Sequence, residues 1–141
     1  MSARLEVRAL LVGKMESLGF TAMEYRDEDD AVNPGDLPFV LIQQVGSVEI
    51  TRAEYMAGGS STHRATFMLS FAATTLDDAE EMMVEGANAL AADSTLGGKV
   101  QDIQPQSYGD EEDEGRDYAA VVLEVQIQFC TSPYDFSTLL Y

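Results

Sequence analysis

Tyr118–Thr131 reads YAAVVLEVQIQFCT and is the longest run of strand-like alternation in the chain. Apolar side chains occupy every second position from Ala119 to Phe129, and Glu124, Gln126 and Gln128 lie between them. Successive side chains of a strand point to opposite faces of a sheet. This period of two therefore predicts a long strand with one face toward a core.

A second stretch, Thr62–Ala73, has the same alternation, with His63 on the apolar side. Val100–Tyr108 also indicates a strand, but Pro105 cannot donate to a ladder and favours an edge or a bend there. Further extended segments are expected at Phe20–Tyr25, at Phe39–Ile42, and at Val45–Arg52 with a bend near Gly46.

Two segments have the apolar spacing of amphipathic helices. Residues 3–18 form the first, ending at a predicted glycine cap, Gly19. The second begins at a cap on Thr74 or Thr75 and ends near Asp93. The expected buried stripes are Val7, Leu11, Met15 and Leu18 in the first helix, and Leu76, Ala79, Met83, Ala87 and Leu90 in the second.

This order of elements predicts one α+β domain over residues 1–131. The expected fold is a two-layer sandwich, in which two helices cover one face of a mainly antiparallel sheet of about four or five strands. Residues 132–141 form a C-terminal arm rich in large apolar side chains. Such a segment has to be buried, either folded over its own core as a lid or docked onto a neighbouring subunit.

The charge is strongly acidic: 25 Asp and Glu face 8 Lys and Arg, giving a net charge of −17. This balance argues against nucleic acid bound on the surface and against anionic membranes. It suits a salt-rich cytoplasm, or a channel that a negatively charged cargo passes without binding. Many of the acidic residues fall in two predicted loops. The candidate lumen or surface residues are Asp27, Glu28, Asp29, Asp30, Asp110, Glu111, Glu112, Asp113 and Glu114.

Catalytic and cofactor motifs are missing from the sequence. His63 and Cys130 are the single residues of their types, so a zinc site is not expected, and the acidic runs lack the ligand spacing of a calcium loop. The glycine pairs 58–59 and 97–98 match neither a P-loop nor a dinucleotide fingerprint. His63 is interpreted as a polar residue at a strand end, and Cys130 as a small buried strand residue. We expect no catalytic residue, no cofactor and no metal.

The N-terminal residues do not resemble a signal peptide, because Glu6 stands where an apolar core would be, and no apolar run is long enough to cross a bilayer. An intracellular, soluble product without membrane contact is expected.

Four short motifs occur in a characteristic order along the chain. They are Leu37-Pro38-Phe39-Val40, Thr62-His63-Arg64, the Asp-x-x-Leu-Gly-Gly turn at Asp93–Gly98, and the Val-Leu-Glu-Val sequence at Val122–Val125. In this respect the chain resembles tail terminator and neck proteins of long-tailed viruses. The resemblance covers nearly the whole chain, although each motif is degenerate. The extreme acidity and the long acidic loops depart from it, and a haloarchaeal virus would account for both.

The resemblance implies a virion protein that is made in the host cytoplasm and located at the head–tail junction. Its copies would form a ring, commonly a hexamer, that binds the tail tube protein and the head connector or neck protein while the genome passes through unbound. Ring closure needs a heterologous interface. The candidate interface residues are Arg52, Tyr55, Met56, Tyr134, Phe136, Leu139, Leu140 and Tyr141.

Other interpretations stay open. Within the same class, the chain could be a head-completion or stopper protein of the neck, or a tail-tube relative. A small acidic binding adaptor of a halophile is an alternative of another class. An enzyme that uses His63 with carboxylate partners is a third, although the sequence supplies no recognisable nucleophile for it.

Overall fold

The computed structural model describes residues 2–23, 37–52, 60–111, 118–132 and 135–140. The helices are α1 (Ala3–Ser17) and α2 (Leu76–Ala92). The strands are β1 (Thr21–Met23), β2 (Phe39–Arg52), β3 (Ser61–Ala73), β4 (Asp102–Glu111), β5 (Ala119–Ser132) and β6 (Asp135–Leu140).

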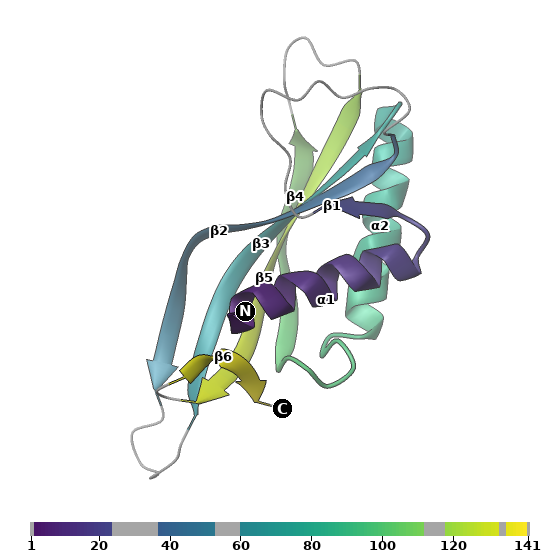
Figure 1. Cartoon of the computed structure of the whole chain (residues 1–141). Helices are drawn as coiled ribbons and strands as arrows, with labels where there is room; N and C mark the ends of the chain where they lie inside the picture. The colour runs from purple at the N-terminus through teal and green to yellow at the C-terminus, as the bar shows by residue number, and fades with distance from the viewer. Residues whose placement is uncertain (1, 24–36, 53–59, 112–117, 133–134, 141) are drawn as a thin grey trace.

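The described strands form one sheet with the order β1-β2-β3-β5-β4, and β6 pairs with β5 beyond the start of β4. β1 runs parallel to β2, and every other pair is antiparallel. Both helices pack on the same face of this sheet and contribute to one apolar cluster. The predicted fold class, a two-layer α+β sandwich with a mainly antiparallel sheet, is confirmed (Figure 1).

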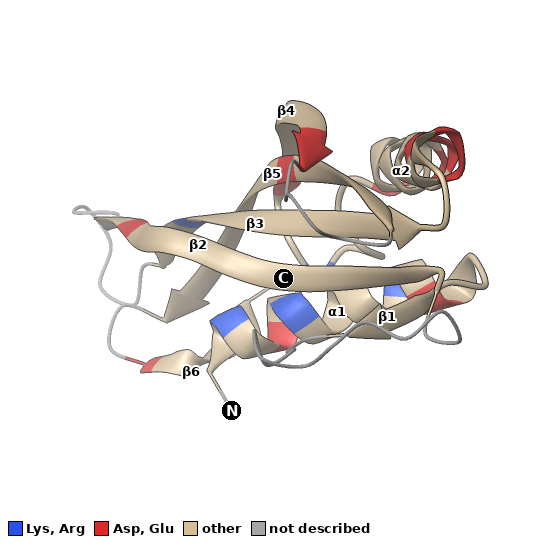
Figure 2. Ribbon diagram, turned by 90° about the horizontal axis from the view of Figure 1, so that it is seen from above, with Lys and Arg blue, Asp and Glu red and all other residues tan. Residues whose placement is uncertain are grey.

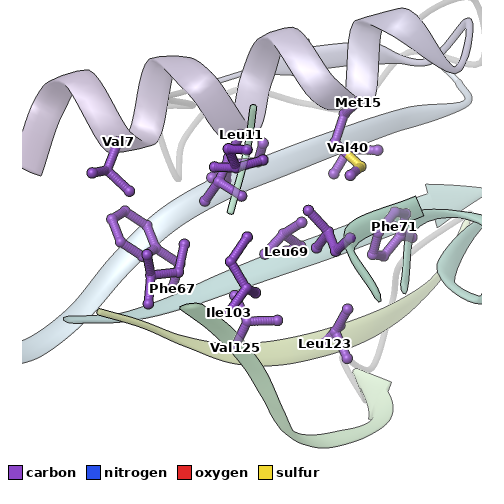
Figure 3. Close-up of a cluster of buried hydrophobic side chains, with 14 of the residues drawn as sticks. Val7, Leu11, Met15, Val40, Phe67, Leu69, Phe71, Ile103, Leu123 and Val125 are labelled. Carbon is purple, nitrogen blue, oxygen red and sulfur yellow. The ribbon is translucent and has the colours of Figure 1, made fainter. Parts of the chain in front are cut away.

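The core lies between α1 and the two central strands (Figure 3). The alternation predicted for these strands is confirmed, because the inward side chains of β3 and β5 are almost fully buried. Figure 3 shows Val7, Leu11 and Met15 pointing from α1 onto this layer. The fully buried rings of Phe67 and Phe71 are among the largest core side chains.

Local hydrogen bonds define the ends of α1. The hydroxyl of Ser2 accepts the N–H of Leu5 at 3.2 Å. At the other end, Gly19 has a φ of 87°, which favours glycine, and its N–H donates to the carbonyl of Glu16 at 2.9 Å. The N–H of Phe20 reaches back to Met15 at 3.3 Å, so the predicted glycine cap is confirmed.

In α2 the predicted apolar stripe is partly wrong. Thr75 is the N-cap, and its hydroxyl accepts the N–H of Asp78 at 3.2 Å. Leu76 is therefore the first helical residue, and its side chain stays 43 % exposed because the buried stripe begins one turn later. The buried residues are Ala79, Met82, Met83, Gly86 and Leu90, so Met82 and Gly86 join the stripe and Ala87 is only partly buried.

The strand predicted to end at Tyr108 is longer than expected, and the prediction that Asp110 and Glu111 belong to an acidic loop is wrong. β4 continues to Glu111, because its backbone stays paired with β5 as far as Ala120. Asp110 and Glu111 alternate in direction along the strand, so their like charges do not force the chain out of the ladder. The irregularity expected at Pro105 is present as a register shift between Pro105 and Ser107 on this edge strand.

The Asp-x-x-Leu-Gly-Gly motif is an ordered turn that joins α2 to the start of β4. One carboxylate oxygen of Asp93 accepts the N–H of Gly97 at 2.9 Å, and the other lies 3.3 Å from Lys14 Nζ on α1. These two interactions, the Gly97 hydrogen bond first, hold the pKa of the Asp93 carboxyl below its ordinary value. Leu96, at the centre of the turn, is buried in the core.

Candidate functional site

The candidate site is one end of the sheet, where β2 and β5 finish, β3 begins and β6 folds back; we call it the β6 end (Figure 1). The strand registers define it. Ile50 on β2 lies opposite His63 on β3, which lies opposite Phe129 on β5. β6 then pairs with the last residues of β5 and contacts α1. Segments far apart in the sequence therefore meet here.

β6 is held to its own chain by a short ladder. Leu140 lies opposite Cys130 and Leu139 opposite Thr131, and the register then shifts so that Asp135 faces Ser132. Leu139 is only 4 % exposed and belongs to the main core cluster. Residues 135–140 thus have the folded-back arrangement, one of the two expected for the arm; docking onto a neighbour stays a prediction.

His63 is the polar centre of the β6 end and is 4 % exposed. Its Nε2 lies 2.9 Å from the hydroxyl oxygen of Thr131. That hydroxyl donates to the carbonyl of Ser132 at 2.9 Å, so Nε2 carries the proton and donates to Thr131. His63 lies near the start of β3, in agreement with its interpretation as a polar residue at a strand end.

Two aromatic rings enclose the imidazole. Phe129 on β5 stacks on it, with ring centroids 4.9 Å apart and an interplanar angle of 11°. Phe136 on β6 meets it edge-on, with a centroid distance of 4.7 Å. Burial in this apolar setting lowers the pKa of His63 below its ordinary value. His63 therefore links β3 to both β5 and β6 while it is neutral.

We expect the protein to lose stability as the pH falls from about 7.5 to 5. The pKa of His63 in the fold lies below its unfolded value of about 6.5, so the stabilising contribution of neutral His63 is complete above that pH. It is lost as the pH falls through about 6.5 toward the pKa in the fold. The free energy of unfolding, measured by urea titration at a series of pH values, checks this.

His63→Gln is the matched control, since glutamine can still hydrogen-bond to Thr131 but does not titrate. Its stability should change little over the same pH range. Asp135 and Asp93 do not interfere, because hydrogen bonds from Ser137 and Gly97, respectively, lower their pKa values and their contributions disappear only in stronger acid. An equal loss in both proteins would contradict the role of His63.

Three exposed apolar side chains lie at the β6 end, on both faces of the sheet. Ile50 is 50 % exposed, Phe136 45 % and Leu140 44 %. Ile50 lies opposite His63, Phe136 contacts the His63 ring, and Leu140 is opposite Cys130. Ile50 and Phe136 lie on the face of the sheet that carries His63, whereas Leu140 lies on the other face with Cys130; we call these three exposed side chains together the apolar end patch. Exposed apolar side chains on both faces of one sheet end are candidates for contact with another protein surface.

The structure brings some of the predicted interface residues together here. The backbone of Arg52 ends β2 at the β6 end, and Phe136, Leu139 and Leu140 are on β6. Tyr55, Met56, Tyr134 and Tyr141 lie outside the described residues. Sequence reasoning missed Ile50 and Thr131 as parts of the site. The alternation of Thr62–Ala73 put His63 on the inner face, but only the strand registers show which residues it meets.

The acidic residues are distributed differently. Asp110 and Glu111 are exposed at the end of β4 that lies away from the β6 end, as their pairing with Val121 and Ala120 shows. The other predicted lumen residues, Asp27 to Asp30 and Glu112 to Glu114, lie outside the described residues. Figure 2 shows further acidic residues on α2, on the side away from the sheet. The exposed acidic residues of this helix are Asp77, Asp78, Glu80, Glu81 and Glu85.

The described part of the chain offers little for chemistry. Within it, no three His, Cys, Asp or Glu side chains gather in a way that could hold a metal ion. Cys130 is buried, with its sulfur 3.7 Å from the Thr62 hydroxyl oxygen, as its interpretation as a small strand residue predicts. Of the helices described, neither is long and apolar enough to span a membrane.

Comparisons with known proteins add a distant likeness in structure. No protein-family model matches the chain, and no curated protein matches it. Among solved structures, a chain from the virion of a native gene transfer agent particle aligns over 90 % of both chains, with 13 % sequence identity and a TM-score of 0.37. A likeness this distant carries no functional conclusion, so the function is inferred from the residues of this chain.

Proposed function

We propose that this protein is a virion structural protein that acts as a tail terminator. In this proposal its copies form a ring at the head-proximal end of the tail tube and join the tube to the head connector. The work is done by contacts between subunits and with neighbouring virion proteins, not by catalysis. The order of motifs that resembles tail terminator and neck proteins supports this choice among assembly proteins.

The observation that carries the proposal is the apolar end patch. A chain with a net charge of −17 is strongly self-repelling, so copies can associate stably only through surfaces with little charge. The patch is such a surface: Ile50 and Phe136 expose apolar area on the face that carries the neutral, buried His63, and Leu140 exposes apolar area on the other face. Aromatic and aliphatic anchors of this kind contribute most of the binding energy in protein interfaces.

The acidic surfaces fit the same proposal. The exposed carboxylates of α2 and of the end of β4 lie outside the apolar end patch, on elements that remain free to face the lumen or the solvent. Like charge keeps a passing genome from binding to the wall of a conduit, because phosphate contacts need Lys and Arg. A ring whose subunits contact one another through the β6 end would leave these carboxylates exposed.

The first test is the size of the purified protein in solution. Light scattering coupled to size-exclusion chromatography should give a closed species near six times the chain mass of 15.4 kDa. Ile50→Lys should shift the protein toward the monomer, whereas Val84→Lys, at a similarly exposed position on α2, should leave the ring intact. A wild-type monomer at every concentration would favour the acidic adaptor instead.

The second test separates a terminator from a stopper or a tube protein. A terminator blocks further addition of tube subunits, so particles made without it should carry tails of uncontrolled length. Loss of a stopper should instead leave tails of normal length that fail to join heads. Electron microscopy of particles from a strain lacking this gene distinguishes the two, and absence of the protein from purified virions would rule out both.

A further inference from the structure

We propose that β6 is exchanged between copies in the assembled ring, so that the C-terminal strand of each chain docks on β5 of its neighbour. The occupant of the docking site is thus the same segment of a second copy. Leu139 of one copy would fill the core position that its own chain fills in the monomer. This inference rests on the proposed function, because it needs copies that associate.

The first support is the weakness of the ladder that holds β6 to its own chain. Among the residues that the structure describes, three pairs join the two strands, and a register shift interrupts them between Thr131 and Ser132. β3, by contrast, pairs with β5 without a shift from Ser61 to Ala73. Detaching β6 therefore breaks few backbone hydrogen bonds and leaves the central sheet in place.

The second support is the sequence of the connection. Only Pro133 and Tyr134 separate Ser132 from Asp135, which are paired across the two strands. Two-residue connections between antiparallel strands favour turns with a positive φ at the first position, usually Gly or Asn. Proline fixes φ near −65° (about 15° either way) and suits an extended chain. The sequence of the connection therefore lacks the residues that favour a tight hairpin, and a short connection of this kind promotes exchange.

The third support is the chemistry of the docking site. The end of β5, Phe129 to Ser132, carries no charged side chain, and β6 carries only Asp135, whose carboxylate already accepts the N–H and hydroxyl of Ser137. Two copies can therefore meet here with little repulsion. Phe136 and Leu140 remain 45 % and 44 % exposed when β6 docks on its own chain, and a second subunit held by the strand can cover them.

The register provides a direct experiment. Cys130 is the single cysteine of the chain and lies opposite Leu140. Directly opposed residues of an antiparallel pair have Cα atoms about 4.5–5.5 Å apart, within the range of about 4.4–6.8 Å that a disulfide spans. In Leu140→Cys the new thiol can therefore bond to Cys130 of whichever chain its strand docks on. The assembled fraction is oxidised and run on a denaturing gel without reductant.

Exchange predicts a ladder of covalent oligomers up to the full ring, because each subunit is then joined to two neighbours. A single band at the monomer position, with both thiols consumed, would overturn the exchange. Thiols that remain unreacted would also overturn the exchange, because a strand docked on a neighbour keeps position 140 opposite Cys130. Cys130→Ser combined with Leu140→Cys controls for chance contacts, as it can give dimers at most. Light scattering on the same samples separates the outcomes: rings with in-chain disulfides contradict only the exchange, and monomers contradict the proposed function as well.

Discussion

Gly86→Ala is expected to destabilise the domain by about 1–3 kcal/mol, although alanine is the better helix former. Gly86 lies in the middle of α2 where the helix packs against β3. A Cβ atom there would lie 2.7 Å from Cζ and 2.9 Å from Cε1 of Phe71, and 3.3 Å from Sδ of Met15. Phe71 is fully buried and cannot move away freely, because Phe20 packs edge-on against its ring with centroids 6.3 Å apart. Chemical denaturation of the variant measures the loss.

Gly13→Ala on α1 is the matched control. Gly13 is also in the middle of a helix, but among the described residues no heavy atom beyond its chain neighbours and the adjacent helix backbone lies within 4 Å of where its Cβ would be. The same substitution should therefore stabilise the protein by about 0.5–1 kcal/mol, through helix propensity and a less flexible unfolded chain. The two variants differ only in the neighbours of the added methyl group. Stabilisation by both would show that α2 does not approach Phe71 as closely as described.

The parts of the fold that sequence predicted well are those determined by local periodicity. The alternation in Tyr118–Thr131 and Thr62–Ala73 identified both central strands and the faces they bury. The spacing of Val7, Leu11 and Met15 identified the buried side of α1 in the same way. In each case the pattern extends over three or more repeats, so a single exception does not hide it.

The parts that sequence did not predict depend on long-range pairing. β6 has no clear alternation and follows a proline, so nothing local distinguishes it from an irregular arm. Asp110 and Glu111 look like loop residues on charge alone, but their backbone pairs with β5. The apolar end patch combines β2 and β6 around a residue of β3, and only the registers bring these segments together. The site was therefore less predictable than the fold that carries it.

Leu139→Ala is expected to have the largest effect of any substitution at the β6 end. Leu139 is 4 % exposed and is a member of the core cluster that also includes α1. Truncating a buried leucine costs about 2–5 kcal/mol, from the lost burial and the cavity left behind. For a chain of this length, that corresponds to a fall in melting temperature of roughly 6–15 °C. Thermal unfolding followed by circular dichroism measures it.

Leu140→Ala tests whether this loss is specific to the buried position. Leu140 is the next residue on the same strand but is 44 % exposed, so its truncation should cost well under half as much in a monomer. Equal losses for both variants would contradict the described packing of β6, in which one leucine is in the core and the next is at the surface.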